Sequence, residues 1–172
     1  MNIRKIIANV LYGILAVLIG FLALQFTRQR QKNRAIVQQM QTLPDFTFYG
    51  TDGIIFKRDS LPHGQALCLI YMDPGCGFCT EETKEIVKHI DRFGETNVLF
   101  VSHVDVAELQ RFADEYGFDA IPQIRLLHDR DYRFTDWFGR AVTPTVYIYD
   151  EQRQLVKTYS GQTKIEAILK HL

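Results

Sequence analysis

The order of apolar and polar positions after residue 44 predicts alternating strands and helices. Residues 66–72, ALCLIYM, form a continuous apolar run with the length of a strand buried on both faces. From Cys79 to Phe93, apolar residues recur every three or four positions until Gly94, which is typical of an amphipathic helix ended by a glycine. Similar patterns predict two short strands within 45–61 joined by a turn at 51–53, strands at 97–103, 123–129, 144–150 and 154–161, and helices at 106–116, 131–139 and 164–172.

The main run of these elements reads strand, helix, strand, helix, strand, short helix, strand, strand, helix. Such alternation requires a mixed central sheet with helices on both faces, so the fold class is α/β. A chain of 172 residues with 47% hydrophobic content buries one good core. We therefore expect one globular domain over residues 44–172.

The N-terminal part of the chain has a different pattern. Residues 6–27 contain no charge, and 22 residues are enough to cross the roughly 30 Å hydrocarbon core of a bilayer as a helix. A cleaved signal peptide is less favoured, because its apolar region spans only about 7 to 15 residues and no A-x-A cleavage site follows. We expect a membrane anchor at 1–27 and a basic, Gln-rich linker at 28–43, formed either by a continuing helix or by a flexible tether.

Charge is segregated along the chain although the formal net charge is zero. Every Asp and Glu lies after residue 44. Six of the 20 basic residues precede it, which leaves 14 against 20 acidic residues and a net charge of −6 for the domain. This balance argues against a nucleic-acid partner. Two basic side chains precede the apolar segment and four follow it, so the positive-inside rule slightly favours a cytoplasmic domain.

The chemistry of the chain centres on Cys76-Gly-Phe-Cys79, which lies between the buried strand and the N-terminus of the next helix. Free backbone N–H groups and the helix dipole stabilise a thiolate there. Such cysteines have pKa values lowered from about 8.5 to roughly 3.5–7.5. Cys76, at the exposed end, is predicted to be the nucleophile, and Cys79, one turn further in, to resolve the mixed disulfide.

These motifs carry a family resemblance. The segments PDFTF, GQALCLIYMDPGCGFCTEE and TPTVYIYDEQRQLVKTYSG resemble thioredoxin-fold proteins, most closely the membrane-anchored thiol–disulfide oxidoreductases of the TlpA/ResA redoxin type, over residues 44–172. The resemblance implies a cis peptide bond at Thr143-Pro144, facing the disulfide and binding substrate. It also implies that Glu82, three residues after Cys79, transfers protons near the buried thiol.

The resemblance extends to location and partners. Similar anchored redoxins are single-pass proteins of the bacterial inner membrane whose domain faces the periplasm, where disulfides persist. This conflicts with the weak charge bias, and the resemblance is taken as the stronger guide. It implies protein thiols and disulfides as partners, an upstream membrane protein as electron donor, and no cofactor beyond the redox-active Cys76–Cys79 disulfide.

The chain also departs from the common reductases. The dipeptide between the cysteines is Gly-Phe, without proline, and together with Thr143 it resembles the disulfide isomerases of the bacterial periplasm. Those isomerases carry a dimerisation domain that is not evident here, so a reductase ranks first and an isomerase or oxidant is the alternative. Phe78 is interpreted either as a contact for partners or as loop packing.

Other interpretations of the same residues stay open. A zinc or copper binding module is one, although no second C-x-x-C is present and a Sco-type copper chaperone needs C-x-x-x-C. A peroxiredoxin-type peroxidase would have Thr or Ser three residues before its reactive cysteine, where Cys76 has Asp73. Cys68 is expected to be a buried structural thiol and Trp137 a core residue. Glu82 could be a solvated helix residue. The five histidines are assigned no role.

Overall fold

The structure is a computed structural model that describes residues 3–172, in which residues 3–36 belong to one compact unit and residues 37–172 to a second. Helix α1, Ile3–Gln39, makes up the first unit and enters the second with its last three residues. The part of the predicted linker up to Gln39 is thus helical. Within the described residues, positions 12–39 of α1 are long and apolar enough to cross a membrane, a test that a signal sequence also passes.

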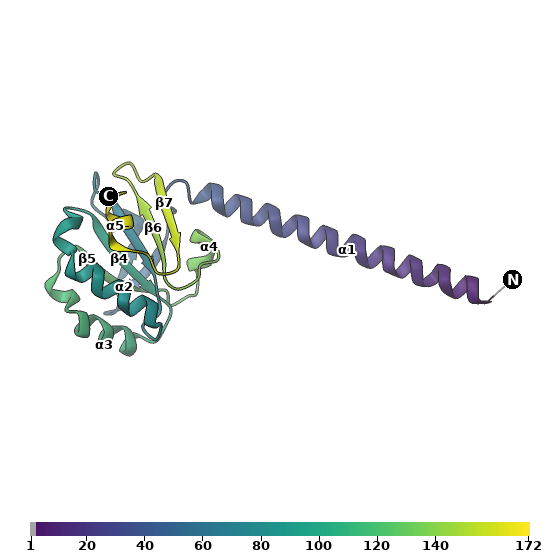
Figure 1. Cartoon of the computed structure of the whole chain (residues 1–172), viewed down its shortest axis with the longest axis horizontal. Coiled ribbons are helices and arrows are strands. Elements are labelled where there is room, and N and C mark those ends of the chain that lie inside the picture. Colours follow the sequence, from purple (N-terminus) through teal and green to yellow (C-terminus); the bar gives the residue numbers. More distant parts are fainter. Residues whose placement is uncertain (1–2) are drawn as a thin grey trace. The chain divides into compact units, whose positions relative to one another are not determined.

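Seven strands of the second unit form one mixed sheet in the order β2-β1-β5-β4-β3-β6-β7 (Figure 1). The central strands β3, β4 and β5 are parallel, and the other neighbouring pairs are antiparallel. This arrangement confirms the predicted mixed sheet. The strands are β1 Thr47–Gly50, β2 Ile55–Lys57, β3 Leu67–Tyr71, β4 Asn97–Ser102, β5 Ile124–His128, β6 Thr145–Tyr149 and β7 Leu155–Ser160.

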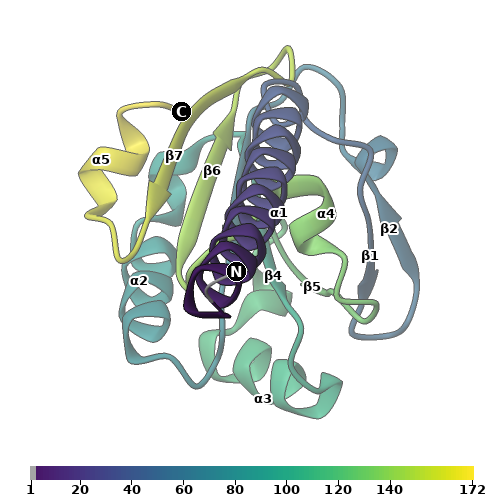
Figure 2. The ribbon, with the colours of Figure 1, turned by 90° about the vertical axis from the view of Figure 1, so that its right-hand side faces the viewer.

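Helices cover both faces of the sheet, as predicted. One face carries α2, α3 and α5, and the other carries the short helix α4. Figure 2 shows α2 and α5 on one side of β6 and β7, and α4 on the other. The helices are α2 Gly77–Lys88, α3 Val106–Tyr116, α4 Phe134–Phe138 and α5 Ile165–Leu169, with short 3-10 turns η1 Arg58–Ser60, η2 Ile90–Phe93 and η3 Phe118–Ala120.

Strand β3 lies between two hydrophobic cores. Cys68 and Ile70 pack into the core beneath α2, α3 and α5, whereas Leu67 and Leu69 pack into the core beneath α4. Successive side chains of a strand point to opposite faces, so a strand covered on both faces needs apolar residues at every position. The structure therefore confirms the interpretation of the run ALCLIYM as a doubly buried strand.

The long helix predicted from Cys79 to Phe93 is interrupted, so that prediction is wrong beyond Lys88. Helix α2 ends at Lys88, His89 leaves the helical region with φ −114° and ψ 21°, and the chain continues as the tighter η2. Phe93 is still buried in the core, which explains why the apolar spacing persists beyond the helix. Gly94 has φ 57°, a left-handed value that suits glycine and ends the segment as expected.

Candidate active site

The end of β3 and the start of α2 hold the cysteine pair in place. Cys76 is the N-cap of α2, with an extended backbone, and its carbonyl accepts the N–H groups of Cys79 at 3.0 Å and Thr80 at 3.1 Å. The preceding turn is fixed by Asp73, whose carbonyl accepts the Cys76 N–H at 3.0 Å and whose side chain accepts the Gly75 N–H at 2.8 Å. Residues 73–76 therefore form a closed turn that presents Cys76 at the helix N-terminus.

The two cysteines are free thiols in unlike surroundings. Cys76 is partly exposed, whereas Cys79 is 1% exposed. Desolvation alone would raise the pKa of Cys76, but hydrogen bonds from the backbone and thiol of Cys79 and from the Phe78 N–H outweigh it and lower this pKa. Burial raises the pKa of Cys79 to about 12. The geometry thus gives one accessible, acidic thiol and one buried, protonated thiol.

The segment before β6 lies against Cys76. The Cys76 thiol donates to the Thr143 carbonyl over 3.8 Å, and the Thr143-Pro144 peptide bond is cis, as the resemblance implies. Val142, next to Thr143, is 61% exposed, and Phe78 between the cysteines is 64% exposed. The alternative that Phe78 packs into the loop is wrong. The partly exposed Cys76 therefore has one exposed apolar side chain two positions along the chain, Phe78, and a second, Val142, next to the Thr143 that its thiol contacts.

Glu82 lies three residues after Cys79 on the buried face of α2 and is only 3% exposed. The alternative of a solvated surface residue is wrong. Its Oε1 accepts the Thr163 N–H at 2.8 Å, and its Oε2 is buried without a hydrogen-bond partner. Burial raises the pKa of Glu82 to about 7, although the Thr163 N–H acts against this rise. The carboxyl group therefore changes its charge near neutral pH.

The other residues considered from the sequence lie away from the reacting sulfur. Cys68 is fully buried in β3, where burial raises the pKa of its thiol far above the usual range. Trp137 packs edge-on against Phe48, with ring centroids 5.3 Å apart, in the core beneath α4. Both positions agree with the structural roles expected for them.

A metal site does not assemble around the cysteines in the described part of the chain. Across residues 3–172, no group of three or more His, Cys, Asp or Glu side chains is arranged to hold an ion. A C-x-x-C motif alone supplies two of the four ligands that a structural zinc site uses. The sequence thus offers half of a zinc site, and the described residues do not complete it.

Sequence patterns did not reveal one partner of the site. Thr163 holds the Glu82 carboxyl group from the loop between β7 and α5, 81 positions further along the chain. The run Ser160-Gly161-Gln162-Thr163 identifies a loop by its composition. Nothing in that run indicates which side chain the loop contacts, because the contact depends on how α5 packs against α2.

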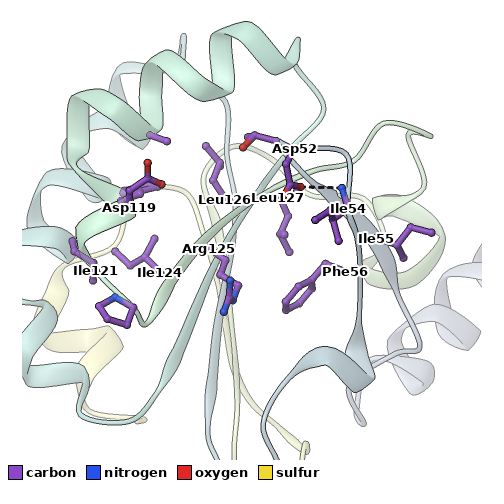
Figure 3. A pocket seen from close by; sticks show the side chains of 15 residues that line it. Asp52, Ile54, Ile55, Phe56, Asp119, Ile121, Ile124, Arg125, Leu126 and Leu127 are labelled. Atoms are coloured by element: carbon purple, nitrogen blue, oxygen red, sulfur yellow. Dashed lines mark hydrogen bonds between the residues drawn. The ribbon is translucent and has the colours of Figure 1, made fainter.

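A separate pocket of about 540 Å³ lies between the β1–β2 turn, η3 and β5 and does not include the cysteines (Figure 3). Two of its polar side chains, those of Asp52 and Arg125, have local partners. Asp52 accepts the Ile54 N–H at 2.9 Å within the turn, and the Arg125 guanidinium lies 5.9 Å from the centre of the Phe56 ring.

A mixed sheet with a C-x-x-C pair at the end of its central strand and a cis-proline beside it defines a redoxin with the thioredoxin fold. The sequence profile of the AhpC/TSA family matches residues 40–158, and the chain belongs to this family. Direct comparison with curated proteins finds no match.

Solved structures show the same fold at low sequence identity. A secreted disulfide oxidoreductase of Mycobacterium tuberculosis, homologous to E. coli DsbE, superposes with a TM-score of 0.64 and 17% identity, covering 78% of this chain and 96% of its own. The exposed lipoprotein thioredoxin Etrx1 of Streptococcus pneumoniae gives 0.56 and 22%, covering 74% and 99%. The peroxidoxin BcpB of M. tuberculosis gives 0.61 and 20%, covering 73% and 87%.

Proposed function

We propose that this protein is a membrane-anchored thiol–disulfide oxidoreductase that exchanges a Cys76/Cys79 dithiol and disulfide with protein partners, in the reducing direction. The observation that carries the proposal is the unequal pair of thiols: the pKa of the accessible Cys76 is lowered, and burial raises that of Cys79 to about 12. Disulfide exchange needs one thiolate that attacks and a second thiol that stays unreactive until the mixed disulfide has formed.

In the first step, the Cys76 thiolate attacks one sulfur of a client disulfide. A bond forms between Cys76 Sγ and that sulfur, the client disulfide breaks, and the other client sulfur leaves as a thiolate that takes a proton from water. The N–H groups of Phe78 and Cys79 stabilise the attacking thiolate before this step. The rate of attack depends on the fraction of Cys76 in the thiolate form.

In the second step, Cys79 gives its proton to the Glu82 carboxylate and attacks Cys76 Sγ. The mixed disulfide breaks, the second client sulfur leaves as a thiolate, and the protein is left with a Cys76–Cys79 disulfide. Two electrons have passed to the client. Glu82 suits this role because it lies on the same helix face as Cys79 and its pKa is about 7. The proton then passes to water.

Client binding is assigned to the surface around Cys76. The exposed ring of Phe78 offers apolar contact, and the Thr143-Pro144 segment lies beside the sulfur that forms the mixed disulfide. Phe78, Thr143 and Pro144 are therefore the substrate-binding residues of the proposal.

The reducing direction requires a donor that returns two electrons to the Cys76–Cys79 disulfide after each cycle. We assign this role to a dithiol of a membrane protein, since α1 would keep the domain at the membrane surface. Similarity to a secreted disulfide oxidoreductase and to an exposed lipoprotein supports a domain outside the cytoplasm, in the periplasm. A disulfide isomerase is the alternative, because Gly-Phe separates the cysteines.

Trapping the mixed disulfide tests the proposal. In the Cys79→Ala variant, the second step is blocked, so Cys76 should stay covalently joined to its natural clients. We expect adducts of high mass that disappear on treatment with a thiol reductant and are missing from the Cys76→Ala/Cys79→Ala double variant. Cys68→Ala is the matched control: added to Cys79→Ala, it should leave the adducts unchanged because Cys68 is fully buried.

The identity of the trapped proteins decides the direction. Clients with a single oxidised pair would support a reductase, and clients with several scrambled disulfides would support an isomerase. Absence of adducts, together with zinc or copper that stays bound through dialysis, would replace the proposal by a metal-binding module. Absence of adducts with rapid consumption of hydroperoxide would replace it by a peroxidase.

A further inference from the structure

The loop between β7 and α5 contacts two parts of the proposed site at once. The Gly161 N–H donates to the Pro144 carbonyl at 2.8 Å, and the Thr163 N–H donates to Glu82 Oε1 at 2.8 Å. The Thr163 hydroxyl donates to the Gly161 carbonyl at 3.0 Å and closes the loop on itself. Residues 161–163 therefore connect the segment beside Cys76 with the carboxyl group near Cys79.

The Glu82 carboxyl group depends on this loop for its hydrogen bonding. Among the described residues, the Thr163 N–H is the only hydrogen-bond donor found for it, and Oε2 has no partner although it is buried. A buried carboxylate with one donor is poorly compensated, because a charged group removed from water needs several hydrogen bonds. Loss of the Thr163 N–H would therefore favour the protonated carboxyl group strongly.

A pocket of about 390 Å³ leads from solvent to this contact. It is lined by Glu81, Glu82 and Glu85 of α2 and by residues 162–166 of the loop and α5. Volume of this size admits several water molecules. The pocket therefore provides an aqueous approach to Glu82 one to two helical turns beyond Cys76, on a part of the surface that a client at Cys76 would not have to cover.

Charged and titratable groups surround Glu82 on each element that packs there. Cys79, Glu81 and Glu85 lie on α2 with it, Cys68 lies beneath it on β3, and Lys164 and Glu166 line the pocket from the other side. Glu81 forms an ion pair with Lys84 at 2.7 Å, and Glu85 forms one with Lys88 at 3.3 Å. The Thr163 N–H is distinguished from them by direct contact with the carboxyl oxygen.

We infer that Thr163 is a positioning residue for Glu82: its backbone N–H holds the carboxyl group for proton transfer with Cys79, and the pocket between α2 and the β7–α5 loop is where Glu82 exchanges that proton with water. This inference rests on the proposed disulfide exchange and on the role of Glu82 in it. It adds a hydrogen-bond donor that positions the Glu82 carboxyl group, and a route by which the proton of Glu82 reaches solvent.

The test removes the N–H and keeps the rest of the chain. Thr163→Pro has no backbone N–H, whereas Thr163→Ser keeps both the N–H and the hydroxyl and is the matched control. The rate of client-disulfide reduction by the full-length reduced protein in detergent should rise with pH as Glu82 ionises. In Thr163→Pro this rise should move to higher pH by about one unit or more, because a hydrogen bond to a charged group favours the charged form about tenfold or more. Thr163→Ser should not move it.

Nuclear magnetic resonance of the unaltered protein provides a second measurement if Thr163→Pro fails to fold. In a sample labelled with ¹⁵N-threonine, the amide signal of Thr163, identified by its loss in Thr163→Ser, should shift with pH at the midpoint of Glu82 ionisation. The Glu82→Gln variant should abolish this shift. An amide that does not respond to pH near neutrality would overturn the inference, as would a folded Thr163→Pro protein with an unmoved pH profile.

Three variants separate a failure of the proposed function from a failure of the role of Thr163. If Cys76→Ala retains exchange activity, the proposed function is wrong. If Glu82→Gln leaves the pH profile unchanged while Cys76→Ala abolishes activity, disulfide exchange stands and Glu82 is not its proton carrier. If Glu82→Gln removes the rise and a folded Thr163→Pro protein does not shift it, Thr163 alone loses its role.

Discussion

At the scale of single residues, the proposed site contains three groups, Cys76, Cys79 and Glu82, that lie within seven positions of the chain but in different surroundings. Cys76 takes its N–H donors from the start of α2, Cys79 has lost contact with water, and Glu82 is a carboxyl group in the core with one hydrogen bond. Burial of Glu82 opposes folding once the group is ionised. Burial of this carboxyl group, which we propose as the proton acceptor for Cys79, therefore costs stability once pH is high enough to ionise it.

This cost gives a prediction for Glu82→Gln. The folded pKa of Glu82 is raised from 4.5 to about 7, so the wild-type protein should lose stability as pH rises through this range and stay at the lower level above it. Glutamine cannot ionise. The difference in unfolding free energy between variant and wild type should therefore change by about 3 kcal/mol in favour of the variant between about pH 4 and pH 8.

Denaturation by urea measures this difference, followed by the fluorescence of Trp137, the only tryptophan of the chain. The matched control is Glu81→Gln, because Glu81 neighbours Glu82 on α2 but is largely exposed and pairs with Lys84 at the surface. Its stability relative to wild type should not depend on pH by more than about 0.5 kcal/mol. Parallel pH curves for Glu82→Gln and wild type would show that Glu82 ionises freely in the folded protein.

At the scale of elements, α4 shows how a helix of five residues persists. An isolated helix of this length is unstable in water. Both carboxylate oxygens of the buried Asp129, just after β5, accept backbone N–H groups at its start, from Arg133 at 2.8 Å and Phe134 at 3.0 Å. Phe134 and Phe138, the first and last residues of α4, bury their side chains in the core. Hydrogen bonds to Asp129 and the burial of two aromatic side chains therefore stabilise a helix that is too short to be stable alone.

Removing the cap should destabilise the domain. Asp129→Ala leaves two N–H groups without acceptors, one of them buried, and we expect a loss of about 2 kcal/mol or more in unfolding free energy. Asp129→Asn keeps one amide oxygen as acceptor and should lose less. Asp136→Ala is the control within α4, because its ion pair with Arg133 is exposed and should contribute under about 0.5 kcal/mol. Equal stability of Asp129→Ala and Asp136→Ala would refute the capping role.

Comparing the elements predicted from the sequence with those of the structure shows which of them sequence patterns can predict. Strand β3 and the helix after Cys76 follow from patterns that local geometry imposes, and the position of the cysteine pair follows from their order along the chain. The break at His89 escaped prediction because Phe93 is buried in either conformation. The contact from Thr163 to Glu82 spans 81 positions and leaves no periodic signal.

At the scale of the whole molecule, the chain joins an acidic domain to a helix, α1, in which an apolar segment is followed by basic residues. The domain has a net charge of −6, and four basic residues lie between the apolar segment and the domain. Redox chemistry by disulfide exchange favours an oxidising compartment. The positive-inside rule places basic flanks in the cytoplasm, and here it favours that side by a small margin. The proposed chemistry therefore favours a domain outside the cytoplasm, whereas the flanking charges favour a cytoplasmic domain.

A reporter fused after residue 43 resolves this disagreement. Alkaline phosphatase needs disulfides formed outside the cytoplasm, so the fusion should be active if α1 spans the membrane with the domain exported. A fusion after residue 5, before the apolar segment, is the matched control and should be inactive. We expect activity only from the longer fusion, because disulfide exchange requires clients whose cysteines are oxidised. An inactive longer fusion, together with activity of a cytoplasmic reporter at the same position, would show that the four basic residues after the apolar segment set the orientation and that the clients must be sought in the cytoplasm.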